Sequence, residues 1–482
     1  MKGSDWSVTM LLVALVTAGP AAAQEEVLLN AQSGGLLPIE NESTLRVVGV
    51  AGTIALRAAR EGQLIYEARS LDNRREERAV ALWLRGRVLE LRPLDEAVQE
   101  RLLIELAVPP GLAAELDLVD SRVQIAGLRS DLVIRGAGLD IDARGIYGTV
   151  DAAIDESVLK LDGTDDDVNV DGGSLELTLK RIGGYATLSL ADSEASVETV
   201  QGAADIDLEN SVLVASKLEG GIRLSARGGK VELAEVKRET DLRLEEAPLV
   251  LSDVIGRATI ESDSDVQFDR LRANMTITSF GGRIRGSGNT EPTVVTTDRS
   301  EVILDQLQGK LALSGDGLTI VLRDIKGDTT VQATSSNVTI EKASGTLDIQ
   351  TDFGDIRVQD ASNALKVISR DGDVMITGHS GSLELHASGN QVEVAWSEIA
   401  KEQNQVIEND NGDVTLRFPA RSACRVEAES SFGRVRSDLP TVRVSDDERF
   451  ASGTLGNSNR PMIQVKSAGD VHITAGQANP ER

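Results

Sequence analysis

The chain is poor in the residues on which most enzymes and disulfide-rich proteins depend. Of its 482 residues, one is cysteine (Cys424), three are histidine and 2% are aromatic. A single cysteine excludes an internal disulfide, and few aromatic rings leave few platforms for stacking on sugars. The net charge of −27 argues against nucleic acid and anionic membrane partners, which bind basic surfaces. It also keeps the chain soluble and discourages end-to-end association.

What the chain has instead is a nine-residue repeat that opens with the pattern apolar, variable, apolar. The openers run from Val123 to Ala258, one residue is then dropped, and the spacing resumes from Val266 to Val392. Because side chains alternate along a strand, both flanking residues face a core and the central residue faces solvent. The flanking positions that are not apolar are Thr240, Gly286, Thr293 and Thr329.

Adjacent repeats differ, so the true period is two nonapeptides, or about 18 residues. Alternate triplets are followed by a further apolar residue, with Thr164 and Asn289 as lapses; the apolar corners are Leu128, Ile146, Ile182, Val200, Leu218, Val236, Val254, Leu271, Leu307, Ile325, Ala343 and Ala361. The other corners carry Gly, Asp, Asn or Ser, which tolerate sharp turns. This pattern predicts an all-β fold, a parallel β-solenoid with two strands per coil. About 15 coils at ~4.8 Å each give a rod roughly 75 Å long.

The two ends depart from the nine-residue spacing. Residues 1–23 have the pattern of a secretory signal peptide, with a short apolar run before Ala21-Ala22-Ala23. We expect an N-terminal β cap at 24–118, solenoid repeats at 119–395, irregular C-terminal coils or a cap at 396–476, and a disordered tail at 477–482.

Local patterns support these boundaries. In the N-terminal region, strand-like segments off the nine-residue spacing surround a charged loop at residues 73–78, and Pro109-Pro110 interrupts the last of them. Near the other end, the mostly polar segment from Trp396 to Gln405 predicts a short helix or a loop. No stretch after the signal peptide is apolar enough to cross a bilayer.

Three stretches suggest a family. They are LLIELAVPPGLAAELDLVDSRVQIAGLRSDLVI at 102–134, the coils GTLDIQTDFGDIRVQDAS and RDGDVMITGHSGSLEL at 345–362 and 370–385, and NGDVTLRFPARSACRVEAESSFGRVRSD at 411–438 followed by MIQVKSAGDVHITAG at 462–476. Together they resemble the bacterial β-strand-repeat adhesin family, a domain of unknown function. The resemblance implies a β-repeat fold and an adhesive role, and it assigns no catalytic residues.

The most suggestive cluster for metal binding is acidic. Asp165, Asp167, Asn169 and Asp171 lie around the inward-facing Val168 and Val170, and the last three of the four share one outer face. Calcium takes several oxygen ligands from such surfaces. The glycine-rich nonapeptide of calcium β-rolls is absent from this sequence, so a solvated acidic corner is the preferred interpretation and no cofactor is expected.

Other candidate groups form no recognisable catalytic pattern. The carboxylate pairs Asp140/Asp142 and Asp205/Asp207 resemble many outward acids along the rod, and glycoside hydrolysis needs a cleft and a set separation. His379, His386 and His472 lack zinc-like spacing. His379 takes an apolar corner position, and Cys424 precedes an apolar strand, so we expect both to be structural.

Apolar residues do occupy four consecutive central positions. Val294 with Ala312, and Ile303 with Val321, would make two outer patches that are either partner sites or covered by terminal segments.

The favoured hypothesis is an exported, non-enzymatic β-solenoid, in the periplasm or at the cell surface, that acts as an envelope scaffold or adhesin-like surface by multivalent display. Its partner would be an envelope protein or a glycan. The alternative is a polysaccharide-binding or polysaccharide-cleaving β-helix protein. A groove lined by aromatic and convergent acidic residues would favour the alternative, and smooth polar faces would favour the scaffold.

Overall fold

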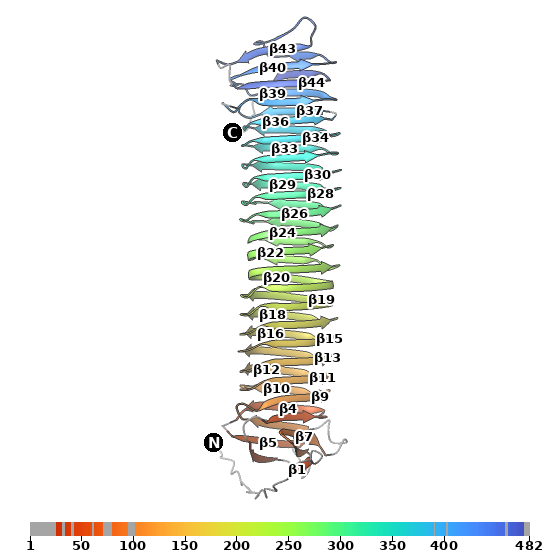
Figure 1. The fold of residues 1–482 in the computed structure, drawn as a ribbon, viewed down its shortest axis with the longest axis vertical. Helices are drawn as coiled ribbons and strands as arrows, with labels where there is room; N and C mark the ends of the chain where they lie inside the picture. Colours follow the sequence, from red (N-terminus) through yellow and green to blue (C-terminus); the bar gives the residue numbers. More distant parts are fainter. Residues whose placement is uncertain are drawn as a thin grey trace.

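The protein is a straight rod of stacked β-strands. The computed structural model describes residues 26–30, 34–39, 43–59, 62–70, 80–94, 102–389, 391–401, 403–457 and 461–476. These residues form strands, turns and loops but no helix (Figure 1); accordingly, none of them belongs to a helix long and apolar enough to cross a membrane. The parallel β-solenoid has about 17 turns with a spacing of about 18 residues, which confirms the predicted fold class.

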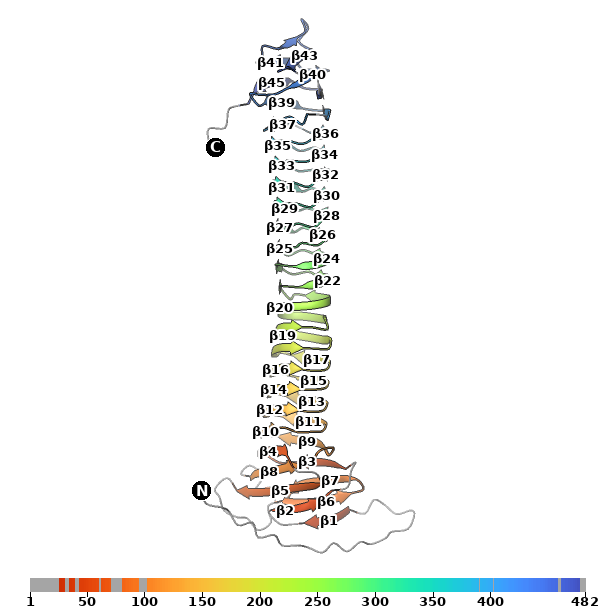
Figure 2. The same cartoon turned by 90° about the vertical axis from the view of Figure 1, so that its left-hand side faces the viewer.

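Each coil contributes one strand to each of two facing sheets (Figure 2). In sheet A, Val123 pairs with Ile141 and Ile141 with Leu159, so each residue pairs with its equivalent in the next coil. In sheet B, Leu132 pairs with Val150 in the same way. The single dropped residue is also confirmed, because Leu249 pairs with Val266, where the regular interval would reach Gln267.

The strands of the regular coils alternate between the sheets in chain order. Sheet A contains β10 (Arg122–Ala126), β12 (Asp140–Ile146), β14 (Val158–Thr164), β16 (Glu176–Ile182), β18 (Glu194–Val200), β21 (Leu249–Ser252), β23 (Val266–Asp269), β25 (Arg283–Ser287), β27 (Glu301–Asp305), β29 (Thr319–Ile325), β31 (Asn337–Ala343), β33 (Ile356–Ala361), β35 (Val374–His379), β37 (Gln391–Trp396) and β39 (Asp413–Phe418). Sheet B contains β9 (Ala113–Val119), β11 (Leu132–Ala137), β13 (Val150–Asp155), β15 (Val168–Gly173), β17 (Ala186–Ala191), β22 (Ile255–Ser262), β24 (Arg272–Phe280), β26 (Thr293–Asp298), β28 (Leu311–Asp316), β30 (Thr329–Thr334), β32 (Leu347–Thr351), β34 (Leu365–Arg370), β36 (Leu383–Ser388) and β38 (Gln405–Asn409).

Two strands continue around the corner from sheet B into sheet A, and the second of them then returns to sheet B, where its last residues pair with β22. These are β19 (Ala204–Leu218) and β20 (Ile222–Glu245). The first half of β19 pairs with β17 and its second half pairs with β18. The chain therefore bends without a hairpin or loop at these corners, and the rungs there are rounded in Figure 2.

The core is a set of apolar columns between the sheets. The flanking residues of the repeat, apart from the half-buried Gly286, and all the predicted apolar corners, from Leu128 to Ala361, are buried. At the opposite corner a serine often replaces the apolar residue. Ser157 Oγ accepts a hydrogen bond from Leu139 N at 2.9 Å, and Ser336 Oγ accepts one from Leu318 N at 2.8 Å. These serines satisfy buried backbone donors between coils.

Glycine is required where one corner lies directly on the next. A Cβ atom added to Gly327 would stand 1.9 Å from the carbonyl oxygen of Gly309, and one added to Gly345 would stand 2.2 Å from that of Gly327. This column of glycines lets the coils stack at the spacing of hydrogen-bonded strands.

The N-terminal end contains both antiparallel strands and two further parallel rungs. Its strands are β1 (Glu26–Asn30), β2 (Gly34–Pro38), β3 (Thr44–Val48), β4 (Gly52–Ala58), β5 (Gln63–Ser70), β6 (Val80–Arg85), β7 (Val88–Pro93) and β8 (Leu102–Val108). β3 and β4 form a rung between β7 and β8 on one side and β9 and β10 on the other. Contrary to the expectation from sequence, Leu45 and Ile54 thus keep the solenoid register.

Antiparallel strands close this end. β6 and β1 follow β7 in one sheet, while β5 and β2 follow β8 in the other. The reversal of direction ends the parallel stack among the described strands at this end.

The C-terminal end has its last strands in the interior of the stack. β44 (Met462–Ser467) and β45 (Val471–Ala475) pair with β38 and β39 below them, and with β40 (Cys424–Ser430) and β41 (Val435–Ser437) above. β43 (Phe450–Leu455) then adds antiparallel to β40, and β42 (Val442–Val444) adds antiparallel to β43. β44 and β45, the last described strands, therefore lie between two coils that both precede them in the sequence.

The segment between Trp396 and Gln405 contains no helix in its described residues. Trp396 ends β37 and Gln405 begins β38. The Trp396 Nε1 donates a hydrogen bond to Gln405 Oε1 at 2.8 Å, and the indole stacks on Phe418 with centroids 5.0 Å apart. Of the two structures predicted for this segment, the loop is confirmed for the described residues and the short helix is wrong for them.

Some predicted features lie outside the described residues. They are the signal peptide at 1–23, the charged loop at 73–78 and the tail at 477–482.

Candidate functional site

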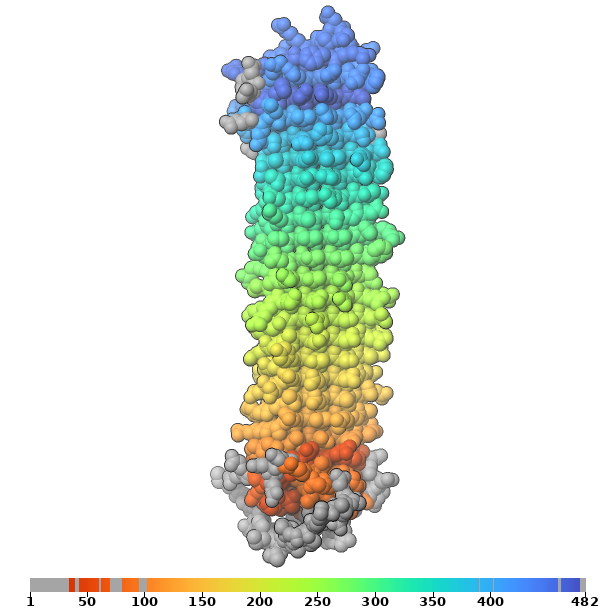
Figure 3. All heavy atoms as spheres, viewed as in Figure 1, coloured from red at the N-terminus to blue at the C-terminus, as the bar shows by residue number. Residues whose placement is uncertain are grey.

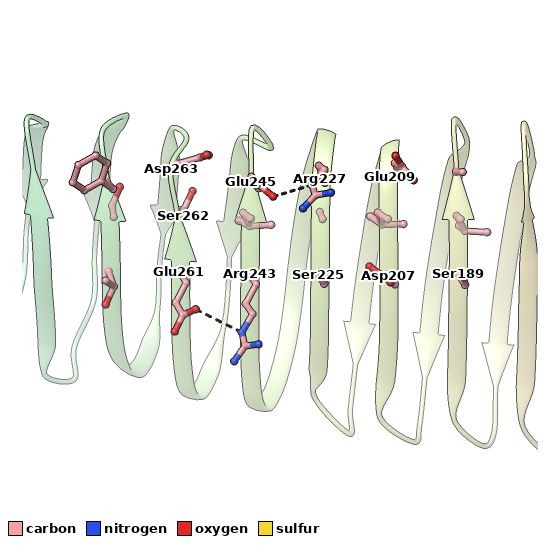
Figure 4. Close-up of a pocket in the computed structure, with 18 of the residues that line it drawn as sticks. Ser189, Asp207, Glu209, Ser225, Arg227, Arg243, Glu245, Glu261, Ser262 and Asp263 are labelled. Carbon is pink, nitrogen blue, oxygen red and sulfur yellow. Dashed lines mark hydrogen bonds and ion pairs between the residues drawn. The ribbon is translucent and has the colours of Figure 1, made fainter.

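A groove runs along the edge of sheet B where β15, β17, β19, β20, β22, β24 and β26 meet the corner (Figure 4). Its volume is about 890 Å³. A second hollow of about 260 Å³ continues over β11 and β13 and shares Asp171 and Ser189 with the groove. The face of the rod that Figure 3 shows has a comparatively even outline between the two ends.

Short side chains create this hollow. Ser189 and Ser225 hold the outward positions of alternate rungs, and Ala191 holds a corner position. Asp207 lies between the two serines in the same column, and Arg243 and Glu261 follow Ser225. The groove therefore has a floor of hydroxyl and methyl groups and charged walls.

The groove is predominantly acidic, with seven carboxylates and two guanidinium groups among its lining residues. Arg227 Nε pairs with Glu245 Oε2 at 2.8 Å, and Arg243 Nε lies 3.6 Å from Glu261 Oε2. The hydrogen bond that Arg227 donates to Glu245 raises the pKa of Arg227, and the charges of Glu209 and Asp207 add to this effect. These pairs neutralise two of the carboxylates. The remaining five are Asp171, Asp207, Glu209, Asp263 and Asp298.

One aromatic residue stands at the C-terminal end of the groove. The Phe280 side chain is 61% exposed, and the Arg299 guanidinium lies 5.0 Å from its ring centroid. A ring that keeps one face open can stack against an apolar or sugar surface.

The four candidate metal ligands do not converge. Asp167 Oδ1 accepts a hydrogen bond from Tyr185 N at 2.8 Å, and Asn169 Nδ2 donates one to Asp151 Oδ1 at 2.6 Å. Asp165 is exposed at a turn, and Asp171 lines the groove. Among the residues that the structure describes, no three His, Cys, Asp or Glu side chains are grouped closely enough to hold a metal ion.

The carboxylate pairs are engaged differently. Asp142 accepts both hydrogen bonds from Arg144, at 2.9 and 2.8 Å, and Asp140 lies 3.2 Å from Arg122. Asp207 lines the groove, whereas Asp205 is exposed near the start of the same strand. Only the second pair thus reaches a hollow surface.

The histidines lie in three separate environments. His379 is fully buried, with Nδ1 2.9 Å from the Ala361 carbonyl oxygen and Nε2 3.2 Å from that of Ser382. Burial lowers its pKa, although the two carbonyls act in the opposite direction. His386 pairs with Glu408 at 3.0 Å on the outer face, and His472 lies 3.3 Å from Asp438. His379 is thus the corner residue that its position predicts.

Cys424 is a buried free thiol at the start of β40. Burial raises its pKa to about 11. A thiol held protonated is a poor nucleophile, so the predicted structural role fits its surroundings.

The predicted apolar pairs lie next to one another. Val294 pairs with Ala312 on β26 and β28, and Ile303 pairs with Val321 on β27 and β29. Both pairs are in the middle of the rod, far from the described strands of the two caps (Figure 1). The terminal segments that the structure describes do not cover them.

The groove was not predicted from the sequence. The signal was present as a column of outward residues, one from each successive coil, running Asp171, Ser189, Asp207, Ser225, Arg243 and Glu261. Short and long side chains alternate at its start, but the repeat places no constraint on outward residues, so it does not predict where they leave a hollow.

The fold defines a class, the parallel β-solenoids with a lateral groove and capped ends. Residues 253–474 match the family model described as Toastrack DUF4097, a domain of unknown function. No curated protein and no solved structure matches the chain. The match confirms the resemblance to a domain of unknown function over these residues, and it begins inside the groove region rather than at the first coil.

Proposed function

We propose that the protein is an exported, non-enzymatic scaffold of the cell envelope, with an adhesin-like role, and that its groove holds an extended partner. The observation that carries this proposal is the groove, which crosses consecutive rungs of sheet B. A linear partner lying along the rod axis would repeat its contacts from rung to rung, so many weak contacts would add up to useful avidity.

The charges of the groove favour binding over acid–base chemistry. A glycosidase pairs one protonated and one ionised carboxyl group across the bond it cleaves. Here Glu245 and Glu261 are held by Arg227 and Arg243, which favours their ionised forms. The remaining acids are spread along the groove instead of converging on one point (Figure 4).

Blocking the groove tests this proposal. Ser189→Arg and Ser225→Arg would each fill the floor with a long side chain, whereas Ser196→Arg adds the same charge to an exposed position of β18 on the opposite sheet. The proposal expects an envelope protein or glycan to be captured by the wild type and by Ser196→Arg, and at least about tenfold less by the groove variants. Equal capture by all three variants would contradict it.

The alternative is a polysaccharide-binding or polysaccharide-cleaving protein. It is favoured by the hydroxyl-rich floor, the five remaining carboxylates and the exposed Phe280 ring. Under this alternative, Phe280→Ala weakens binding of a soluble glycan, and release of new reducing ends would show cleavage. Glycan binding that is unchanged by Phe280→Ala, Ser189→Arg and Ser225→Arg would rule out the polysaccharide-binding alternative.

A further inference from the structure

The C-terminal cap differs from the rod in charge. Residues 419–476 contain eight Lys and Arg against seven Asp and Glu, whereas residues 102–418 contain 29 against 55. Two copies of this chain therefore repel each other along their flanks, but meet no such repulsion at this end. The net charge of −27, taken alone, predicts repulsion between copies at this end as well.

The outermost part of this cap, residues 431–450, exposes apolar side chains and is called the C-terminal tip. Phe432 is 84% exposed, Phe450 43% and Val444 36%. The chain has six phenylalanines, and two of them are displayed here. Arg449 Nη1 donates a hydrogen bond to the Ser431 carbonyl oxygen at 2.5 Å, so the segments that carry Phe432 and Phe450 are joined.

The Phe432 ring is displayed from a fixed backbone. Ser431 N donates to the Ser467 carbonyl oxygen at 2.9 Å, and Phe432 N donates to that of Ala468 at 3.1 Å. A Cβ atom on the following Gly433 would lie 2.4 Å from the carbonyl carbon of Gly469. An exposed ring on an ordered backbone costs little entropy when it is buried in an interface.

The tip also has an open strand edge. Within the described part of the chain, β42 pairs with β43 on one side and with no strand on the other. The neighbouring β41 is shielded, because Val435 N donates to the Glu448 carbonyl oxygen at 2.6 Å. An open edge is a template for a further strand.

We propose that the C-terminal tip is a self-association surface through which two copies of this chain join end to end about a two-fold axis. Such an axis brings the same surface together from both copies, so the surface must complement itself. The charges of the tip can complement themselves, because it carries four arginines and four acidic residues. They are Arg434, Arg436, Arg443, Arg449, Asp438, Asp446, Asp447 and Glu448.

The order of these charges fits an antiparallel meeting. Arg443 comes shortly before Asp446 and Asp447 in the chain. Two antiparallel copies of this segment place unlike charges opposite each other, and β42 of each copy extends the sheet of the other. The end face of a two-sheet rod is small, so the dimer is weak, with a dissociation constant on the order of micromolar. This inference does not depend on the groove.

Sedimentation velocity over a concentration series from about 1 to about 100 µM tests the inference. Val444→Asp places a carboxylate on the open strand, and Val294→Asp places one on an exposed valine in the middle of the rod. We expect a monomer–dimer equilibrium for the wild type and for Val294→Asp, and a dissociation constant raised at least tenfold by Val444→Asp.

A second pair of variants controls for misfolding as the cause of a weaker dimer. Phe432→Ser and Phe353→Ser each remove an exposed ring from a Phe-Gly corner, the first at the tip and the second at mid-rod. Phe432→Ser should weaken the dimer and Phe353→Ser should not, with unchanged melting by circular dichroism. A wild-type monomer at about 100 µM, equal effects of tip and mid-rod variants, or growth beyond dimers through head-to-tail contacts would each overturn the inference.

Discussion

Phe268 and Gly286 form a complementary pair inside the rod, and changing them together tests how the coils pack. They are register neighbours on β23 and β25, in a column between Leu251 and Leu304. Phe268 is buried, and a Cβ atom on Gly286 would lie 1.9 Å from its Cζ. The ring thus fills the space that the missing side chain of Gly286 leaves.

Each single change should destabilise the coils around residues 250–305. Phe268→Leu removes part of the ring and costs about 1–2 kcal/mol, below the roughly 3–5 kcal/mol typical of a change to alanine. Gly286→Ala forces a methyl group against the ring and costs about 1–3 kcal/mol through overpacking. In the double variant the methyl group occupies space that the shorter leucine vacates, so the total should fall at least ~1 kcal/mol below the sum.

Amide hydrogen exchange of these coils is the appropriate assay, because stability in stacked repeats is a sum of local terms. The control cycle combines Phe268→Leu with Gly173→Ala, a distant glycine whose added Cβ would meet nothing closer than 3.6 Å. That pair should be additive. Additivity within ~0.5 kcal/mol for Phe268 and Gly286 as well would refute the packing argument.

Three further predictions follow from single residues. Gly327→Ala should cost more than ~2 kcal/mol in urea unfolding, because its Cβ would strike the Gly309 carbonyl at 1.9 Å, while Gly173→Ala stays within ~0.5 kcal/mol; equal costs would contradict the stacking of the corners. The lowered pKa of buried His379 stabilises the fold above the ordinary value of about 6.5, and this contribution is lost as pH falls below it, by at most ~1.4 kcal/mol per pH unit. His379→Leu should flatten that acid limb of a stability–pH curve, and an unchanged limb would count against the assignment. With its pKa raised to about 11, Cys424 should react with iodoacetamide at about pH 8 far more slowly in the folded protein than in urea, and equal rates would show that the thiol is accessible.

The repeat could be predicted because the core imposes it on every coil. Some of its lapses have local causes: Asn289 Nδ2 donates to Thr293 Oγ1 at 2.9 Å, so the polar corner and the polar opener satisfy each other. Thr329 Oγ1 similarly donates to the Gly327 carbonyl oxygen at 3.3 Å. Thr240 is buried with its hydroxyl unpartnered, and nothing in the structure explains it.

The ends and the groove could not be predicted to the same extent. The register of β3 with β9 joins Leu45 to Ala114, and a pairing between segments so far apart in the chain leaves no periodic signal. The insertion of β44 beneath β40 reverses the order of coils in the chain. The groove is lined by outward residues, and because no core constrains these residues the repeat does not predict the groove.

The central claim is that each coil advances the chain by one strand spacing along one straight rod. Spin labels on a cysteine-free background at Gln124 paired in turn with Val214, Gln267 and Arg285 test it, because these four residues lie in one register column of sheet A. Electron–electron distances should be about 24, 38 and 43 Å, for five, eight and nine coils at ~4.8 Å. Distances that level off or shorten with coil number would contradict the account.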